Sequence, residues 1–340
     1  MIELFGPTYR YAGEKLHKPE IIWINDHCYN EEDQCFHVQK LLEAGPCDPQ
    51  LHTIIFDHVG HDDALNKYNT LCFPIFLAAE CQEFIDQNIT TNWNNKTHIF
   101  NFSLNKPRIH RNLLLKEIER LNLNNYTHSL PWQFNNVNSI PVTDFKFGPE
   151  HTMEQGIKNG SFKNAHTYDA LLKTTVFEPS CVSIITEPCY YEQETIHTEK
   201  TFMSIMAGTI PIWFGGWKLP QTLKRFGFDV FDDIVDHSYE TLENPRDRCI
   251  QALERNLDLL LDLNRTKQLI EKNHTRLEHN RALLLSNPFV EECFQITMAS
   301  QNSLRLALLK IVPTFRQDKF RQLWRQYKQK ALELDYHIYE

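Results

Sequence analysis

The sequence around residue 199 has residue types that could bind a phosphate group. Thr198, Glu199 and Lys200 lie between a polar segment and an apolar helical pattern, so Thr198 is expected to cap a helix that opens at Glu199. The N–H groups and dipole of a helix N-terminus favour an anion, and a cation there costs roughly a few tenths of a kcal/mol. Lys200 in that first turn therefore indicates an anionic partner such as a diphosphate, and Glu199 could accept both ribose hydroxyls. The alternative is an ordinary helix start with Lys200 solvated.

A second group of cations follows an expected strand that ends near Phe102. Lys106, Arg108 and Arg111 stand where this strand passes into a helix, at the strand's carboxyl end. Arginine can hold a phosphate through two parallel hydrogen bonds. In a chain with a formal net charge of −9, three cations in one such loop are typical of a phosphate clamp. A basic loop that merely solvates its helix is the alternative.

Asp57 and His58 follow another expected strand and stand at its carboxyl end. A base near pKa 6.5 such as histidine can take a proton from a hydroxyl group at neutral pH. A loop histidine without a catalytic role is the alternative for His58. Neither Asp62-Asp63 nor Asp232-Asp233 has an Asp-x-Asp spacing, so both pairs are expected to be structural, with no metal or cofactor at either.

Short apolar runs alternate with helical patterns along the chain, which predicts an α/β fold with mostly parallel strands. We expect two Rossmann-like lobes facing a cleft, at residues 1–96 and 97–290, and a helical C-terminal extension at 291–340. A ligand would then lie at the carboxyl ends of the strands. The expected strands are 21–24, 53–56, 97–102, 182–185 and 210–214. The expected helices are 32–44, 72–85, 111–121 and 199–207, with further helical runs from 244 to about 285 and beyond.

Composition limits the classes of function. A chain of 340 residues suits two domains, and its negative charge argues against nucleic acid as a partner. The nine cysteines form no CxxC pair, which is typical of reduced thiols. We see no signal peptide and no apolar run long enough to span a membrane. A cytoplasmic protein is expected.

The segment TEKTFMSIMAGTIPIWFG, residues 198–215, resembles the donor-binding motif of the α1,3-fucosyltransferase family. In that family a Thr-Glu-Lys is followed at fixed spacing by Ile-Pro-Ile and a glycine, and Pro211 and Gly215 stand at those positions. The upstream Ser103, Asn105 and Arg111 resemble the family's Ser-Asn followed by an arginine. Phe56-Asp57-His58, with the segment 68–74 downstream, is similar to a Phe-Asp-Glu of the first lobe. Similar sequences occur in glycosyltransferase-like proteins of large viruses and phages.

The resemblance implies a GT-B fold and an inverting sugar transfer from a GDP-sugar, such as GDP-fucose, to a hydroxyl of a glycan or glycoconjugate, without an essential metal. Two departures stand out: Ile196 replaces an aromatic residue, and His58 replaces the glutamate that serves as base. A non-catalytic nucleotide-sugar or glycan-binding module therefore remains the alternative. The candidate catalytic residues are His58 and Asp57. The candidate donor-binding residues are Glu199, Lys200, Arg111, Arg108, Glu187 and Thr198.

The C-terminal segment 305–331 combines positive charge with one apolar face. Eight Lys or Arg residues stand between Arg305 and Lys330, against one acid, Asp318. A basic amphipathic helix can lie on an anionic membrane surface, which would make the protein peripheral there. The alternative is that this face packs on the protein body. The apolar face comprises Phe320, Leu323, Trp324, Tyr327 and Ala331.

Overall fold

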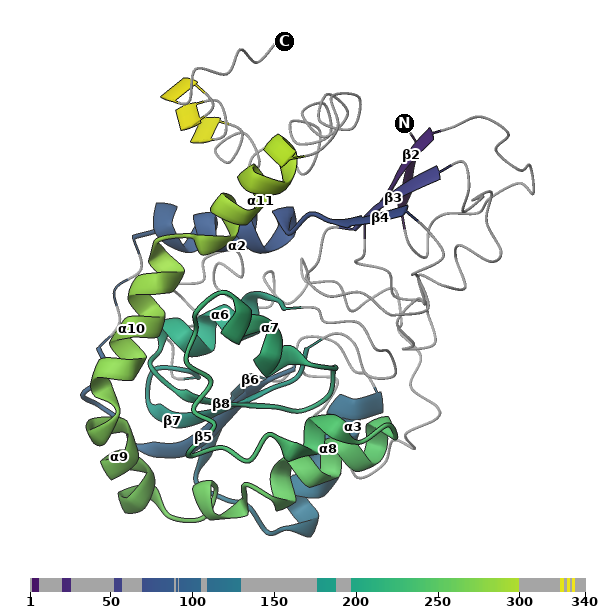
Figure 1. Ribbon diagram of the computed structural model, residues 1–340. Coiled ribbons are helices and arrows are strands. Elements are labelled where there is room, and N and C mark those ends of the chain that lie inside the picture. Colours follow the sequence, from purple (N-terminus) through teal and green to yellow (C-terminus); the bar gives the residue numbers. More distant parts are fainter. Residues whose placement is uncertain are drawn as a thin grey trace, which may run out of the picture. The chain divides into compact units, whose positions relative to one another are not determined.

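The computed structural model describes two compact units of the chain (Figure 1). One unit comprises residues 1–28, 36–86 and 285–340, and the other comprises residues 29–35 and 87–284. Among the helices described, none is long and apolar enough to cross a lipid bilayer. The described residues are 2–5, 20–25, 52–56, 69–88, 90, 92–104, 109–129, 176–187, 197–299, 325–326, 329–330 and 332–333.

The first unit contains a parallel sheet of four strands in the order β1-β2-β3-β4. Two of the strands, β2 and β3, were expected from their apolar runs, and in the sheet Ile22 lies opposite Ile54. After β4 comes a helix that starts at Ile75 rather than at Cys72, because a residue before proline avoids helical backbone and Pro74 stands between them. The elements are β1 (Ile2–Phe5), β2 (Glu20–Asn25), β3 (His52–Phe56), β4 (Asn69–Cys72) and α2 (Ile75–Asp86).

A C-terminal helix, α11 (Pro288–Ala299), packs against α2 in the same unit. Phe84 of α2 and Phe289 of α11 are both fully buried. The side chain of Asn287, just before α11, donates to the carbonyl oxygen of Ala78 at 2.8 Å. Residues 285–340 therefore group with the first sheet, and the expected domain limits at 96 and 290 stay a prediction.

The described part of the C-terminal segment also packs on these helices. Gln326 donates to the side chain of Gln82 in α2 at 2.5 Å. Lys330 pairs with Glu291 of α11, and its ammonium lies 5.2 Å from the ring centre of Phe294. These contacts favour packing on the body at those two positions. The apolar positions 320, 323, 324, 327 and 331 lie outside the described residues.

The second unit contains another parallel sheet, in the order β6-β5-β7-β8. The α/β class with parallel strands is thus confirmed, whereas the arrangement of two lobes about a cleft stays a prediction. The strands are β5 (His98–Ser103), β6 (Tyr126–Ser129), β7 (Ser180–Ile185) and β8 (Ile210–Trp213). The helices are α3 (Ile109–Arg120), α6 (Glu199–Met206), α7 (Leu219–Arg225), α8 (Pro245–Glu254), α9 (Leu263–Lys272) and α10 (His274–Leu285).

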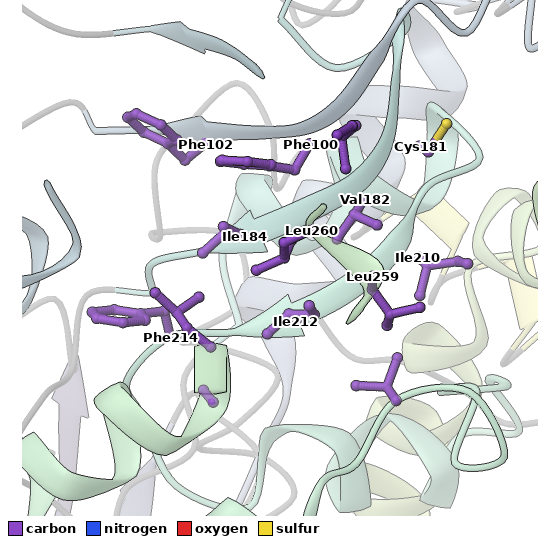
Figure 2. Close-up of a cluster of buried hydrophobic side chains, with 14 of the residues drawn as sticks. Phe100, Phe102, Cys181, Val182, Ile184, Ile210, Ile212, Phe214, Leu259 and Leu260 are labelled. Atoms are coloured by element: carbon purple, nitrogen blue, oxygen red, sulfur yellow. The ribbon is translucent and has the colours of Figure 1, made fainter. Parts of the chain in front are cut away.

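One face of this sheet is apolar. The register places Phe100 beside Val182 and Val182 beside Ile210. Two residues further along the strands, Phe102, Ile184 and Ile212 form a second row of the same kind. Side chains from α3 and α8 belong to the same hydrophobic core. Figure 2 shows the pair Leu259 and Leu260 against the apolar side chains of the sheet. In Figure 1, α3 and α8 lie together on one side of the sheet, with α6 and α7 on the other side.

The opposite face carries a buried polar network under α6. The side chain of Asn101 on β5 donates to the hydroxyl of Ser183 on β7 at 3.0 Å. That hydroxyl lies 2.7 Å from the hydroxyl of Thr209, which in turn lies 2.7 Å from that of Ser204 in α6. A buried polar group costs free energy unless it is bonded, so this chain of contacts fixes how α6 sits on the sheet.

Candidate functional site

Helix α6 begins at Glu199, as the sequence predicted. Thr198 is the N-cap residue, with extended backbone (φ −124°, ψ −176°), and its side chain accepts a hydrogen bond from the backbone N–H of Lys200. The N-cap satisfies one of the N–H groups that the first turn leaves without a helical partner. At the other end Gly208 has φ +58°, and the chain passes directly into β8.

Glu187 follows β7 and is fully buried, with 0% of its surface exposed. Its carboxylate accepts from the backbone N–H of Thr198 at 2.9 Å and from the Thr198 hydroxyl at 2.5 Å. The hydroxyl of Thr201 also donates to it, at 2.6 Å. Burial raises the pKa of Glu187, and the nearby Lys200 ammonium and these hydrogen bonds oppose that rise. The end of β7 is thereby bonded to the first turn of α6.

Lys200 and Glu199 form an ion pair at the start of α6. The Nζ of Lys200 lies 2.7 Å from a carboxylate oxygen of Glu199 and 3.4 Å from the Thr198 hydroxyl. The Lys200 side chain is 7% exposed and that of Glu199 is 24% exposed. Burial alone would raise the pKa of Glu199, but the charge and hydrogen bond of Lys200, a backbone hydrogen bond and the charge of Arg111 together lower the pKa to about 2. Glu199 is therefore ionised at neutral pH.

The side chain of Arg111, in the first turn of α3, lies close enough to Glu199 for their charges to interact. Its guanidinium donates to the carbonyl oxygen of Thr186 at 3.1 Å, and only 3% of its surface is exposed. The adjacent His110 donates through Nε2 to the carbonyl oxygen of Glu187 at 2.8 Å. The carboxyl ends of β5 and β7 lie side by side because the two strands are parallel neighbours. The structure thus brings Arg111 to Glu199 and Lys200, although α3 and α6 are far apart in the sequence.

The cluster contains two cations, Arg111 and Lys200, and two carboxylates, Glu187 and Glu199. The Glu199 carboxylate is ionised beside the two cations, whereas burial raises the pKa of Glu187. An anion that bound here could take the donors of Lys200 from Glu199, because a phosphate oxygen and a carboxylate oxygen are comparable acceptors for an ammonium. The carboxylate of Glu199 would then be available to accept hydroxyl groups of the same ligand. The arrangement suits a ligand that carries both a phosphate and neighbouring hydroxyls.

No protein-family model, curated protein or solved structure is significantly similar to this chain. The resemblance to the fucosyltransferases therefore rests on the motif residues alone.

Sequence reasoning missed two buried residues beside the cluster, His197 and Thr201. Both are buried, and the Nδ1 of His197 lies 3.4 Å from the Thr201 hydroxyl. Burial lowers the pKa of His197 to about 3, so the ring is neutral, and it lies edge-on to Trp213 with 6.5 Å between ring centres. The signal for Thr201 was its position three residues after the cap Thr198, which places both hydroxyls on one face of the helix.

Several residues considered in the sequence analysis lie outside the described residues. These are Asp57, His58, Asp62, Asp63, Lys106, Arg108 and Ile196, together with the expected helix 32–44. The candidate general base and the Arg108 part of the cation clamp therefore stay predictions.

Asp232 and Asp233 take part in ion pairs. Asp232 lies 2.5 Å from the ammonium of Lys224, and Asp233 lies 2.7 Å from the guanidinium of Arg276. These contacts bind the segment to α7 and α10, as a structural role requires. Within the described part of the chain, no group of three or more His, Cys, Asp or Glu side chains is arranged to hold a metal ion.

The C-terminal end of α6 is also held by side chains. Trp93 donates through Nε1 to the carbonyl oxygen of Met206 at 3.0 Å. Lys96 donates to the carbonyl oxygens of Ala207 at 2.8 Å and Glu178 at 3.0 Å. Only 4% of the Lys96 surface is exposed, and burial lowers its pKa from 10.5 to about 7. The helix that presents Glu199 and Lys200 is thus bonded at both ends.

Lys96 is expected to make stability depend on pH above neutrality. The unfolded chain binds the Lys96 proton more tightly, so the free energy of unfolding should fall as the pH decreases from 10.5 towards 7. The slope is at most about 1.4 kcal/mol per pH unit. Urea unfolding at pH 7 and at about pH 8.5, below most thiol titration, measures it. Lys96→Met should flatten the slope, and an unchanged slope in that variant would contradict the assignment.

Proposed function

We propose that this protein is an inverting glycosyltransferase that moves a sugar from a GDP-sugar to a hydroxyl of a glycan or glycoconjugate. The observation that supports the proposal is the meeting of Lys200, Arg111 and Glu199 at the carboxyl ends of two parallel strands. Ligands of open parallel α/β sheets bind at this edge. The fucosyltransferase-like motif assigns the same three residues to the nucleotide and its phosphates. GDP-fucose is the donor that the motif favours.

The chemistry of such a transfer fits the residues in the cluster. As the bond to the sugar breaks, the sugar gains positive charge and the leaving diphosphate gains negative charge. Lys200 and Arg111 would stabilise that diphosphate, and Glu199 would accept the ribose hydroxyls. Fixed charges aimed at a developing charge contribute roughly 3 kcal/mol each. His58, or Asp57 beside it, would take the proton of the attacking hydroxyl. We also propose the GT-B arrangement, with the first sheet on the acceptor side.

A thermal-shift panel of GDP-, UDP-, CMP- and dTDP-sugars tests the choice of donor. A ligand at 100 times its Kd raises the free energy of unfolding by about 2.7 kcal/mol. We expect GDP-sugars to raise the Tm by several degrees and the other nucleotides to have little effect. Selective stabilisation by UDP-sugars would overturn the GDP assignment. No stabilisation by any nucleotide sugar would contradict a donor site in this protein.

A non-catalytic binding module is the second candidate, because histidine stands where the family has its catalytic glutamate. Such a module would bind the donor but would neither transfer the sugar nor hydrolyse the donor slowly. Release of GDP from a donor that the thermal-shift panel shows to be bound distinguishes the two. Binding without any release of GDP over hours would favour the module.

A further inference from the structure

We infer that Glu187 is a positioning residue, which holds the first turns of α3 and α6 together and so sets the places of Arg111 and Lys200. The inference rests on the proposed function, because Arg111 and Lys200 are the cations assigned to the diphosphate. In this role Glu187 does not contact the donor itself. The carboxylate is fully buried, and both of its oxygens already accept hydrogen bonds from α6 and its cap.

The side chain of Glu187 acts on α6. One oxygen accepts from the Thr198 backbone N–H and from the Thr201 hydroxyl, and the other accepts from the Thr198 hydroxyl. The same Thr198 hydroxyl oxygen accepts from the backbone N–H and the Nζ of Lys200. The Glu187 carboxylate therefore orients the Thr198 hydroxyl, which accepts hydrogen bonds from Lys200.

The main chain at Glu187 acts on α3. Its carbonyl oxygen accepts from His110, and the preceding carbonyl oxygen, of Thr186, accepts from Arg111. Two successive residues of α3 are thus bonded to two successive carbonyl groups after β7. Because the main chain at 186–187 is bonded to α3 while the Glu187 side chain is bonded to α6, loss of the side-chain bonds should displace Lys200 relative to Arg111.

Thr201 extends the arrangement to β8. Its hydroxyl accepts from the indole N–H of Trp213 at 3.2 Å and has one proton, which it donates to Glu187. A valine at 201 would keep the shape of the side chain but remove these hydrogen bonds and the contact with His197, whereas serine would keep them. Thr201 is fully buried in α6, so substitutions there test the positioning without removing a group that could touch the ligand.

The experiment measures the binding of inorganic pyrophosphate and of GDP by calorimetry. The variants are Glu187→Gln, Thr201→Val and Thr201→Ser, with Glu117→Gln as the control. Glu117 is a buried glutamate of α3 that pairs with Arg120, so its substitution changes another buried carboxyl group, on the helix that carries Arg111. We expect Glu187→Gln and Thr201→Val to weaken both ligands about tenfold, the equivalent of one or two lost hydrogen bonds. Thr201→Ser and Glu117→Gln should bind like the wild type.

The two ligands separate positioning from a direct contact. Pyrophosphate has no ribose, so a loss of affinity for GDP alone would mean that Glu187 touches the nucleoside, and it would overturn the inference. Wild-type affinity of Glu187→Gln and Thr201→Val for both ligands would overturn it as well.

Hydrogen exchange keeps the inference testable if the proposed function fails. If the wild type bound neither pyrophosphate nor GDP, the proposed donor site would be wrong. Positioning still requires faster exchange of the amide hydrogens at 200–203 in Glu187→Gln and Thr201→Val than in the wild type or Glu117→Gln. Unchanged exchange in both variants would overturn the role of Glu187 whatever the ligand.

Discussion

Replacement of Lys200 with alanine is expected to lower the rate of donor turnover by about 10²–10³-fold. Lys200 is an almost fully buried cation at the start of a helix that is bonded at both ends. A charge held in this way needs little reorganisation as the diphosphate gains negative charge, so its removal raises the barrier for bond breaking. Release of GDP from GDP-fucose, with a glycan acceptor and without one, measures the effect.

The matched control for Lys200→Ala is Lys224→Ala. Lys224 is an exposed lysine of α7 whose partner is the exposed Asp232, and exposed ion pairs contribute little to stability. Turnover by that variant should equal that of the wild type. Full retention of turnover by Lys200→Ala would show that the donor diphosphate does not bind at the start of α6. Equal losses in both variants would point to a general effect of charge.

The elements β7, α6 and β8 could be predicted well from the sequence. The apolar runs at 182–185 and 210–214, the capping threonine and the glycine at 208 each specify local backbone through residue type. The proximity of Arg111 to Lys200 was predictable because both follow parallel strands, and such strands end at the same edge of the sheet. These features depend on local chemistry and on one general rule of topology.

The short strands could not be predicted. The strands β1, β4 and β6 mix polar with apolar residues, unlike the equally short but wholly apolar β8, so pairing with a neighbour decides their conformation. In β6, Tyr126 stacks on Phe100 of β5 with 5.1 Å between ring centres, which is a long-range contact.

The internal partners of the candidate site were also hidden in the sequence. Glu187 was predicted to bind the donor, but nothing in its neighbours revealed three donors from α6 and its cap. The Lys200–Glu199 ion pair and the Thr201 link to Trp213 depend on distances that only the folded chain sets. Residue types indicated which side chains could bind a ligand or act in catalysis. The tertiary structure decides which of these side chains are already bonded to other residues.

Substitution of Gly208 by alanine is expected to lower the free energy of unfolding by about 2–5 kcal/mol. The backbone at Gly208 is left-handed, with φ +58°, which costs a residue with a side chain about 1–2 kcal/mol. An added Cβ would lie 2.4 Å from the Trp93 ring, and overpacking of this kind costs about 1–3 kcal/mol more. Trp93 has little room to move, since its N–H is bonded to Met206 and its ring lies against His274 and Arg281.

Gly227→Ala separates the two causes of that loss, and urea unfolding of both variants measures them. Gly227 is also left-handed, with φ +90°, but its added Cβ would meet only Leu283, at 3.5 Å, which is an ordinary contact. Because φ +90° lies further than φ +58° from the centre of the left-handed region, the backbone cost at Gly227 should be at least as large. A greater loss in Gly208→Ala therefore measures the clash with Trp93. Equal losses would show that the Trp93 ring gives way, and α6 would then be held less firmly at this end than its hydrogen bonds indicate.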